Sequence, residues 1–302
     1  MRLVTRSDFD GLACGALLFY LGIVDEWLFV HPKDIQDGVV EVTENDVLAN
    51  IPYAKGCHLW FDHHSSESER LGPEILPNMI TKLTSSCARV IYDYYGGEKK
   101  LGRFAEMLEY VDRIDSAHLT QDEILNPKRW VLLGFIMDPR TGLGRFRNFT
   151  ISNLDLMKKL ARDFVDKSID EILEMPDVKE RITLYQEQEK LFIEMLRKYS
   201  RTDGPVVITD LRGVETINAG NRFIIYGLYP DQNISVWVVD GRQKVNCSIG
   251  VGYSIINQTA IADVGSILLK YGGGGHQRVG TCQVDYGEAD RIIGEIVEQL
   301  KG

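Results

Sequence analysis

The chain has 302 residues, of which 26% are charged and 44% hydrophobic, and its formal net charge is −10 at pH 7. This length exceeds one typical domain, so we expect two compact units with their own cores. No apolar run is long enough to cross a bilayer, which argues against a transmembrane protein. The acidic balance argues against binding long duplex nucleic acid, but it leaves room for a local basic pocket that takes a short anionic ligand.

The first residues, "MRLVT", lead directly into a strand-like segment, with no hydrophobic signal region behind a basic start. We therefore expect a soluble cytoplasmic protein. The five cysteines are scattered without paired spacing, which argues against a disulfide framework and against a zinc knuckle. We expect them to be thiols of the core.

Strand-like apolar runs alternate with helical patterns in the first half of the chain, as in a parallel sheet with crossover helices. The pattern predicts strands at residues 1–5, 26–31 and 57–61. It predicts helices at 11–23 and 85–95, the second with a Ser N-cap in front.

After the Gly- and Arg-rich stretch "PRTGLGRFRNF", the composition shifts to long charged helices. Residues 177–200 are typical of a connecting helix, and the remainder returns to short strands, predicted at 206–210, 223–229 and 233–240. The sequence thus predicts an α/β protein. An N-terminal parallel-sheet domain and a smaller C-terminal α/β domain are joined by a helical linker.

Two carboxylates, Asp8 and Asp10, follow the first predicted strand and precede a helix. Open α/β sheets bind ligands at this place, outside the carboxyl ends of the strands. Two carboxylates so close in one loop can both turn toward one hard cation. Each Asp taken singly fits a helix N-cap equally well, so this motif alone leaves both interpretations open.

Asp62, His63 and His64 end another predicted strand and can therefore share the same sheet edge. Adjacent residues of an extended segment point in opposite directions. One histidine could then bind a metal while the other meets the substrate or a neighbouring group. The alternative is a turn with two partly exposed histidines.

A further acidic pair, Asp112 and Asp115, lies three residues apart and can share a helical face or a helix end. An exposed charged helix would show the same pattern, so a ligand role and a solvated face both stay open.

The stretch "KYGGGGHQRVG" contains four consecutive glycines, Gly272 to Gly275, followed by His276 and Arg278. Such a run costs folding entropy that no ordinary turn requires, and it frees backbone amides to converge on an anion. The alternative is a flexible hairpin.

The order of "SDFDG", "DHH", "SSCARVIYDYY", the acidic pair and "GGGGHQRVG" resembles the DHH phosphoesterase family. That family includes RecJ-like exonucleases, enzymes that degrade very short RNAs or linear dinucleotides, and exopolyphosphatase-like proteins. The resemblance covers nearly the whole chain. It implies a metal-binding catalytic domain over residues 1–180, a linker helix over 181–202, and a substrate-binding domain over 203–302. The glycine loop of the last domain would face the DHH triplet across a cleft.

The resemblance also implies roles for individual residues. The implied metal ligands are Asp8, Asp10, His63, Asp112 and Asp115. The implied catalytic residues are Asp62 and His64. Arg6 is a further catalytic candidate that the family pattern does not supply. The implied substrate contacts are Gly273, Gly274, Gly275, His276 and Arg278, with Arg140 as a further anion contact because a guanidinium donates two hydrogen bonds at once. Mixed oxygen and nitrogen ligands favour Mn²⁺, with Mg²⁺ as the alternative.

Two positions depart from the family pattern. Arg6 stands where a His is usual, and Asn50 stands where an Asp usually bridges two metals, unless the nearby Asp46 takes that place. A guanidinium cannot ligate a cation, and a neutral amide bridges two ions poorly. We therefore expect one metal ion, with Arg6 paired to Asp8 and holding the substrate phosphate. A third departure is Val279, which stands where a small residue is usual and would narrow the pocket beside the glycine loop.

The function that follows is metal-dependent hydrolysis of a small phosphate-rich substrate such as a dinucleotide, a short oligonucleotide or a nucleotide-derived phosphate. Two alternatives stay open, an exopolyphosphatase-like activity and a catalytically weakened nucleotide-binding protein. The expected partner is a small phosphorylated molecule or a short single-stranded oligonucleotide, without long duplex nucleic acid or membrane. Whether the protein forms a homodimer is open.

Overall fold

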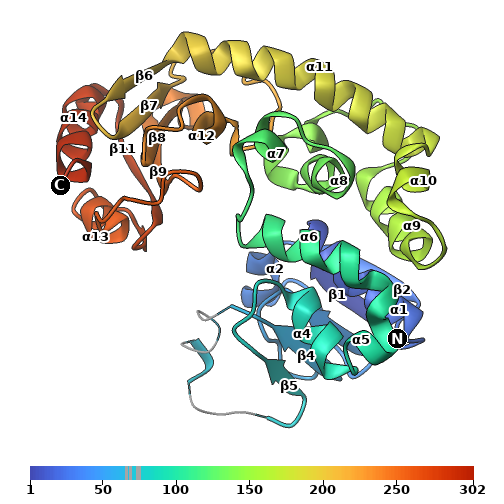
Figure 1. Cartoon of the computed structure of the whole chain (residues 1–302). Helices are drawn as coiled ribbons and strands as arrows, with labels where there is room; N and C mark the ends of the chain where they lie inside the picture. Colours follow the sequence, from blue (N-terminus) through green and yellow to red (C-terminus); the bar gives the residue numbers. More distant parts are fainter. Residues whose placement is uncertain (65–66, 68–69, 73–75) are drawn as a thin grey trace. The chain divides into compact units, whose positions relative to one another are not determined.

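The structure is a computed structural model that describes residues 1–302 except 65–66, 68–69 and 73–75 (Figure 1). The chain folds into two compact units. The first consists of Met1–His118 and Lys128–Leu184, and the second of Leu119–Pro127 and Tyr185–Gly302. The boundary lies inside the long helix α11 (Pro176–Tyr199). The roles expected for residues 1–180, 181–202 and 203–302 stay a prediction.

The first unit is built on a five-stranded parallel sheet in the order β2-β1-β3-β4-β5. Its strands are β1 (Arg2–Arg6), β2 (Glu26–Val30), β3 (Asp46–Ala49), β4 (Leu59–Asp62) and β5 (Met79–Thr81). Besides the first part of α11, its helices are α1 (Phe9–Tyr20), α2 (Pro32–Gln36), α4 (Cys87–Tyr94), α5 (Glu98–Leu101), α6 (Ala105–Asp115), α8 (Arg129–Met137), α9 (Asn153–Asp166) and α10 (Ile169–Leu173), with the 3-10 turns η1 (Gly102–Phe104), η2 (Pro139–Thr141) and η3 (Leu143–Arg145). The predicted parallel-sheet domain is confirmed.

The central strands of this sheet carry apolar side chains on both faces, as expected where helices cover both sides. Val4, Leu48 and Trp60 lie in register on β1, β3 and β4 and share one buried cluster. Phe61, the next residue of β4, packs on the other face against Tyr94 of α4, with 5.5 Å between the ring centroids. Helices α4, α6 and α9 all pack against α1. This arrangement brings the carboxyl ends of β1, β3 and β4 to one edge.

The second unit contains a six-stranded mixed sheet in the order β10-β11-β9-β8-β7-β6, in which only the β7–β8 pair is parallel. Its strands are β6 (Ser200–Asp203), β7 (Val206–Asp210), β8 (Ile234–Asp240), β9 (Asn246–Tyr253), β10 (Gly274–His276) and β11 (Val279–Asp285). Besides the end of α11, its helices are α7 (Gln121–Leu125), α12 (Ile224–Leu228), α13 (Val264–Leu269) and α14 (Ala289–Leu300), with the 3-10 turns η4 (Arg242–Lys244) and η5 (Tyr286–Glu288). Buried residues alternate along β11, and the buried face joins a core with α13 and α14.

One predicted strand is wrong. Residues 223–229 contain the short helix α12 rather than a strand. Ile224 and Ile225 are fully buried, so the segment lacks the exposed positions that distinguish a helix from a strand by periodicity. The side chain of Asn221 accepts a hydrogen bond from the Phe223 backbone N–H, 3.0 Å away, and so starts the turn.

The cysteines match their expected role, since all five are free and buried. Within the described part of the chain, every helix is too short or too polar to cross a membrane.

Candidate metal centre and active site

The residues singled out near the N-terminus gather at the carboxyl edge of the first sheet. Asp8 and Asp10 follow β1, Asn50 follows β3, and His63 follows β4. Parallel neighbouring strands end at the same edge of a sheet, which is where such folds bind ligands.

Asp10, His63 and Asp115 form a cluster in which one ligand atom of each lies within 4.8 Å of the others. His63 Nε2 lies 3.8 Å from Asp10 Oδ2 and 3.4 Å from Asp115 Oδ2. Ligands bound to one small cation at about 2.0–2.2 Å lie at most roughly 4.4 Å apart, so small side-chain shifts would bring all three onto one ion. The three side chains, which come from distant segments of the sequence, lie close together as expected. Their roles as metal ligands stay a prediction.

The Asp10 carboxylate is held at the N-terminus of α4. It accepts hydrogen bonds from the backbone N–H groups of Cys87 at 2.9 Å and Ala88 at 2.8 Å. Burial raises the pKa of Asp10 well above its usual range, and the nearby carboxylates of Asp115 and Asp8 act in the same direction. Burial and the Asp8 carboxylate likewise raise the pKa of Asp115. A bound divalent cation would offset the repulsion between these neighbouring carboxylates and stabilise their charged forms.

The orientation of His63 fits a metal ligand. Its Nδ1 lies 3.1 Å from the backbone carbonyl of Thr84, which places the proton on Nδ1 and leaves a lone pair on Nε2. Nε2 is buried and has no hydrogen-bond partner among the residues that the structure describes. Buried polar atoms are rarely left unpaired, so the donor set fits a divalent cation.

Asp62 and His64 form a second pair beside this cluster. His64 Nδ1 donates to Asp62 Oδ1 at 2.8 Å, and this hydrogen bond raises the pKa of His64. Asp62 is 1% exposed, whereas the His64 side chain is 41% exposed. The two histidine rings lie 4.2 Å apart. The structure therefore separates a buried carboxylate from an accessible imidazole, and the two histidine rings lie close together instead of pointing in opposite directions.

Asp8 is the N-cap of α1, and both oxygens of its carboxylate have partners. Oδ1 accepts from the Gly11 backbone N–H at 2.9 Å and from Asn50 Nδ2 at 3.1 Å, and Oδ2 pairs with Arg6 Nε at 3.0 Å. The predicted Arg6–Asp8 pair is thus present. The helix-cap interpretation, which the motif left open, is the one that describes Asp8, and Asp8 does not belong to the cluster.

Asn50, not Asp46, stands at the edge that carries the site. Asp46 begins β3 at the opposite end of the sheet, where it forms a hydrogen-bonded ion pair with Arg2, and Asp46 Oδ1 lies 2.6 Å from Arg2 Nε. The Arg2 guanidinium and the donors of Thr43 lower the pKa of Asp46, although burial acts the other way. Asp46 is therefore no candidate for a bridging ligand at this centre.

Of the two later acids, only Asp115 reaches the cluster. Asp112 Oδ1 accepts from Ser86 Oγ at 2.6 Å, and Oδ2 accepts from Arg89 Nε at 2.8 Å and Nη2 at 2.6 Å. These contacts tie α6 to α4, because Ser86 is also the N-cap of α4. The proposed ligand role of Asp112 finds no support in this geometry.

Arg140 lies next to the centre. It lines a small cavity of about 10 Å³ together with Asp8, Asp10 and Asp115. Its guanidinium is held by Asp138, with Nε 2.8 Å from Oδ1. Asp138 and Thr84 are site residues that the sequence analysis missed. The first is an acid at a helix end, but the second acts through a backbone carbonyl, which no residue pattern reveals.

The glycine run belongs to the second unit, where it leads into the β10–β11 hairpin, and its last two glycines begin β10. A Cβ on Gly273 would lie 2.2 Å from the Thr281 carbonyl oxygen and 2.4 Å from Cys282 Cβ, so the run has a packing reason of its own. His276, Arg278 and Val279 are all exposed on this hairpin. The substrate-binding roles of Gly273, Gly274, Gly275, His276 and Arg278 stay a prediction.

The close packing of Gly273 leads to a stability prediction. Gly273→Ala is expected to lower the free energy of unfolding by about 1–3 kcal/mol, as overpacking does. Gly274→Ala is the matched control, because a Cβ there meets nothing within 4 Å. Denaturant unfolding of both variants measures the difference, and equal stabilities would contradict the packing argument.

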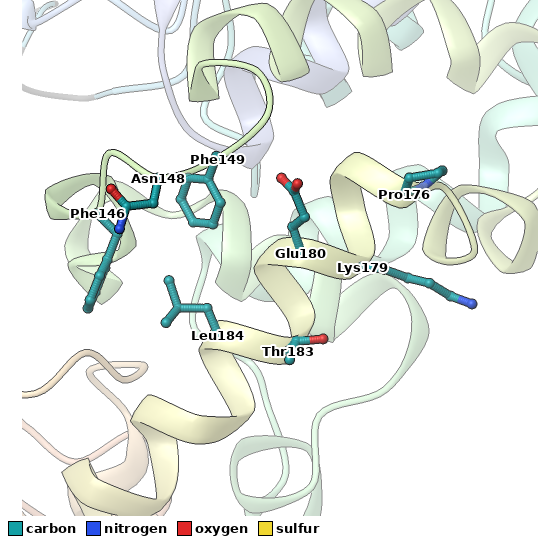
Figure 2. Close-up of a pocket in the computed structure, with 8 residues that line it drawn as sticks. All are labelled: Phe146, Asn148, Phe149, Pro176, Lys179, Glu180, Thr183 and Leu184. Atoms are coloured by element: carbon teal, nitrogen blue, oxygen red, sulfur yellow. The ribbon is translucent and has the colours of Figure 1, made fainter.

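A larger cavity of about 540 Å³ lies elsewhere in the first unit, between residues 146–149 and α11 (Figure 2). Its apolar lining comes from Phe146, Phe149 and Leu184. The Arg181 guanidinium stacks on the Phe149 ring, 4.1 Å from its centroid, and so fixes one wall. None of the site residues predicted from the sequence lines this cavity.

No family model and no curated protein matches the chain. Among solved structures, PggH from Vibrio cholerae, a pGpG-specific phosphodiesterase, is 47% identical, and the match covers 99% of this chain and 98% of that one with a TM-score of 0.90. The DHH domain of a member of a ribosomal protein family is 11% identical over 99% of this chain and 86% of that one, with a TM-score of 0.58. RecJ from Thermus thermophilus in complex with Mg²⁺ is 14% identical over 98% of this chain and 48% of that one, with a TM-score of 0.50.

The two distant matches show a shared fold alone. The near-full-length match to a phosphodiesterase, together with the DHH triplet at the carboxyl edge of the parallel sheet, shows the family. The chain belongs to the DHH phosphoesterase family and is a phosphoric ester hydrolase.

Proposed function

We propose that this protein is a manganese-dependent phosphodiesterase that hydrolyses a short linear dinucleotide, with pGpG as the first candidate. The observation that carries the proposal is the 47% identity to a pGpG-specific phosphodiesterase over almost the whole of both chains. The cluster of Asp10, His63 and Asp115 supports it independently, because its unpaired buried imidazole nitrogen fits a metal-dependent hydrolase.

Asp10, His63 and Asp115 would hold the divalent ion. When bound, such an ion lowers the pKa of a coordinated water and polarises a phosphoryl oxygen. The mixed carboxylate and imidazole ligands favour Mn²⁺, and Mg²⁺ is the alternative. Asp10 is fixed by two backbone N–H groups and His63 by one carbonyl, so two of the three ligands are preorganised by the fold.

His64 would act on the phosphate itself. Asp62 orients its ring through Nδ1 and favours the protonated form, which leaves an N–H on Nε2 for a phosphate oxygen or for the leaving oxygen. In the reaction, water oxygen bonds to the bridging phosphorus, the bond from phosphorus to the 3′ oxygen breaks, and the leaving oxygen takes a proton. One dinucleotide and one water then yield two nucleoside 5′-monophosphates.

Arg140 is a candidate substrate contact, and separate candidates lie on the glycine hairpin. Arg140 supplies a cation beside the acidic cluster, and the exposed His276 and Arg278 supply donors for a second phosphate. A cytoplasmic location also stays a prediction.

The test is a substrate comparison. Metal-free protein reconstituted with Mn²⁺ or Mg²⁺ is assayed on pGpG, a second linear dinucleotide, a cyclic dinucleotide, a longer oligonucleotide and inorganic polyphosphate. Linear dinucleotides are expected to give the highest kcat/KM and pGpG the highest among them. Faster release of phosphate from polyphosphate would favour the exopolyphosphatase alternative. Tight pGpG binding without turnover in any metal would favour a nucleotide-binding protein.

A further inference from the structure

The Asp8 carboxylate is already bound inside the protein. It is 6% exposed, Oδ1 accepts from two N–H donors, and Oδ2 pairs with the Arg6 guanidinium. A second cation at this position would have to compete with the positive charge of Arg6, which already balances the carboxylate.

Asn50 is built to serve as a donor here. It is 3% exposed and adopts the left-handed conformation at φ 58°, which Asn tolerates better than most residues. Its backbone N–H donates to the Phe61 carbonyl at 3.2 Å, and its Nδ2 donates to Asp8. The amide therefore adds a neutral hydrogen bond at a place where an acid would add a second negative charge.

Arg6 is held by Asp8 through its Nε, which lies 3.0 Å from Asp8 Oδ2. Within the described residues, no hydrogen bond of its two terminal nitrogens is found. The side chain is 32% exposed, so these nitrogens can be reached by a ligand.

We propose that this centre binds a single divalent cation and that the Arg6 guanidinium, held by Asp8 and supported by Asn50, replaces a second cation as the ligand of a non-bridging phosphate oxygen of the substrate. This inference rests on the proposed function. A guanidinium suits the task, because its planar fork donates two parallel hydrogen bonds to a phosphate and its charge does not depend on pH in the working range. Arg6 therefore binds substrate directly, and Asn50 is a positioning residue.

Metal analysis gives the first readout, and it does not depend on activity. Wild-type protein reconstituted with Mn²⁺ and freed of excess metal is expected to hold one ion per chain. Two tightly bound ions would overturn the proposal. Arg6→Ala is expected to keep the single ion, with its Kd within about threefold of wild type, because Arg6 contacts none of the three cluster residues in this arrangement.

The same variant is expected to lose substrate affinity. Calorimetric binding of pGpG to metal-free protein should weaken by about tenfold or more, and kcat/KM should fall by about 10²–10³-fold, the usual loss when one preorganised donor to a developing charge is removed. Arg6→Lys keeps the positive charge but lacks the planar guanidinium. Its affinity for pGpG and its kcat/KM should lie between those of wild type and Arg6→Ala. Arg2→Ala is the matched control, since Arg2 stands at the other end of the same strand and pairs with Asp46. An Arg6→Ala variant that binds pGpG and turns it over like the Arg2→Ala control would refute the role of Arg6.

The paired change Arg6→His with Asn50→Asp removes the guanidinium and the amide from the Asp8 side chain and leaves only the Gly11 backbone N–H of its three partners. The expected result is a second bound Mn²⁺ per chain. A count of one in a folded paired variant, judged by circular dichroism, would overturn the claim that Arg6 and Asn50 keep that ion out. If wild type hydrolyses no dinucleotide at all, the proposed function fails, while the metal counts still decide the number of cations.

Discussion

His63→Ala is expected to abolish tight Mn²⁺ binding and to lower kcat by more than about 10²-fold. Replacing a residue that only supports a metal ligand costs up to about 10²-fold, so the loss of a ligand should cost more. His63 supplies the one nitrogen of the cluster, and its Nε2 lies within 3.8 Å of both carboxylates. Without it, the carboxylates of Asp10 and Asp115 remain, and two ligands are too few to hold a cation against water.

The measurement is Mn²⁺ binding by calorimetry together with steady-state kinetics on the best substrate. His58→Ala serves as the control, because His58 is exposed at the start of the same segment and its backbone alone makes a hydrogen bond, to the Asp46 carbonyl. The control is expected to bind metal and turn over like wild type. A His63→Ala variant with unchanged metal affinity would show that the cluster is not the metal centre.

Much of the site could be predicted because its parts lie at the ends of strands. A strand followed by acidic residues and a helix places those residues at the ligand-binding edge of a parallel sheet, whatever the details of packing. Asp10 and His63 meet for this reason, although they come from distant parts of the sequence. The alternation of strands and helices was enough to predict a parallel first sheet, although β3 and β5 were not predicted as strands.

The rest depended on contacts that a residue pattern does not contain. Asp112 and Asp115 are equally placed on α6 by periodicity, and only the position of Arg89 on α4 decides which of them is already paired. Whether Asp46 or Asn50 stands at the site depended on where β3 begins and ends. Residues 223–229 were misread because a fully buried apolar segment shows no helical or strand period.

Asp115→Asn is expected to weaken Mn²⁺ binding, whereas Asp112→Asn is expected to lower stability. The two changes are chemically identical and lie about one helical turn apart. Asp115→Asn should raise the Kd for Mn²⁺ by at least about 10–100-fold and lower kcat/KM in parallel, because a neutral amide replaces a charged ligand. Its metal-free form should be as stable as wild type or more stable, since the change removes one of the neighbouring carboxylates whose pKa values burial raises.

Asp112→Asn should instead leave the Kd for Mn²⁺ within about threefold of wild type and lower the free energy of unfolding by about 1–3 kcal/mol, the range for a buried hydrogen-bonded group left with a poor partner. The reason is that Asp112 accepts from Arg89 and from Ser86, the N-cap of α4, so its charge holds two helices together. Calorimetry with Mn²⁺ and urea unfolding of the metal-free proteins measure both quantities. If Asp112→Asn lost the metal and Asp115→Asn kept it, the ligand assignment would be reversed. Asp112 also supports α4, whose N-terminus holds Asp10, so any small loss of activity in Asp112→Asn should scale with its loss of stability. The loss of activity in Asp115→Asn should instead scale with the loss of bound metal, and a high Mn²⁺ concentration should restore part of it.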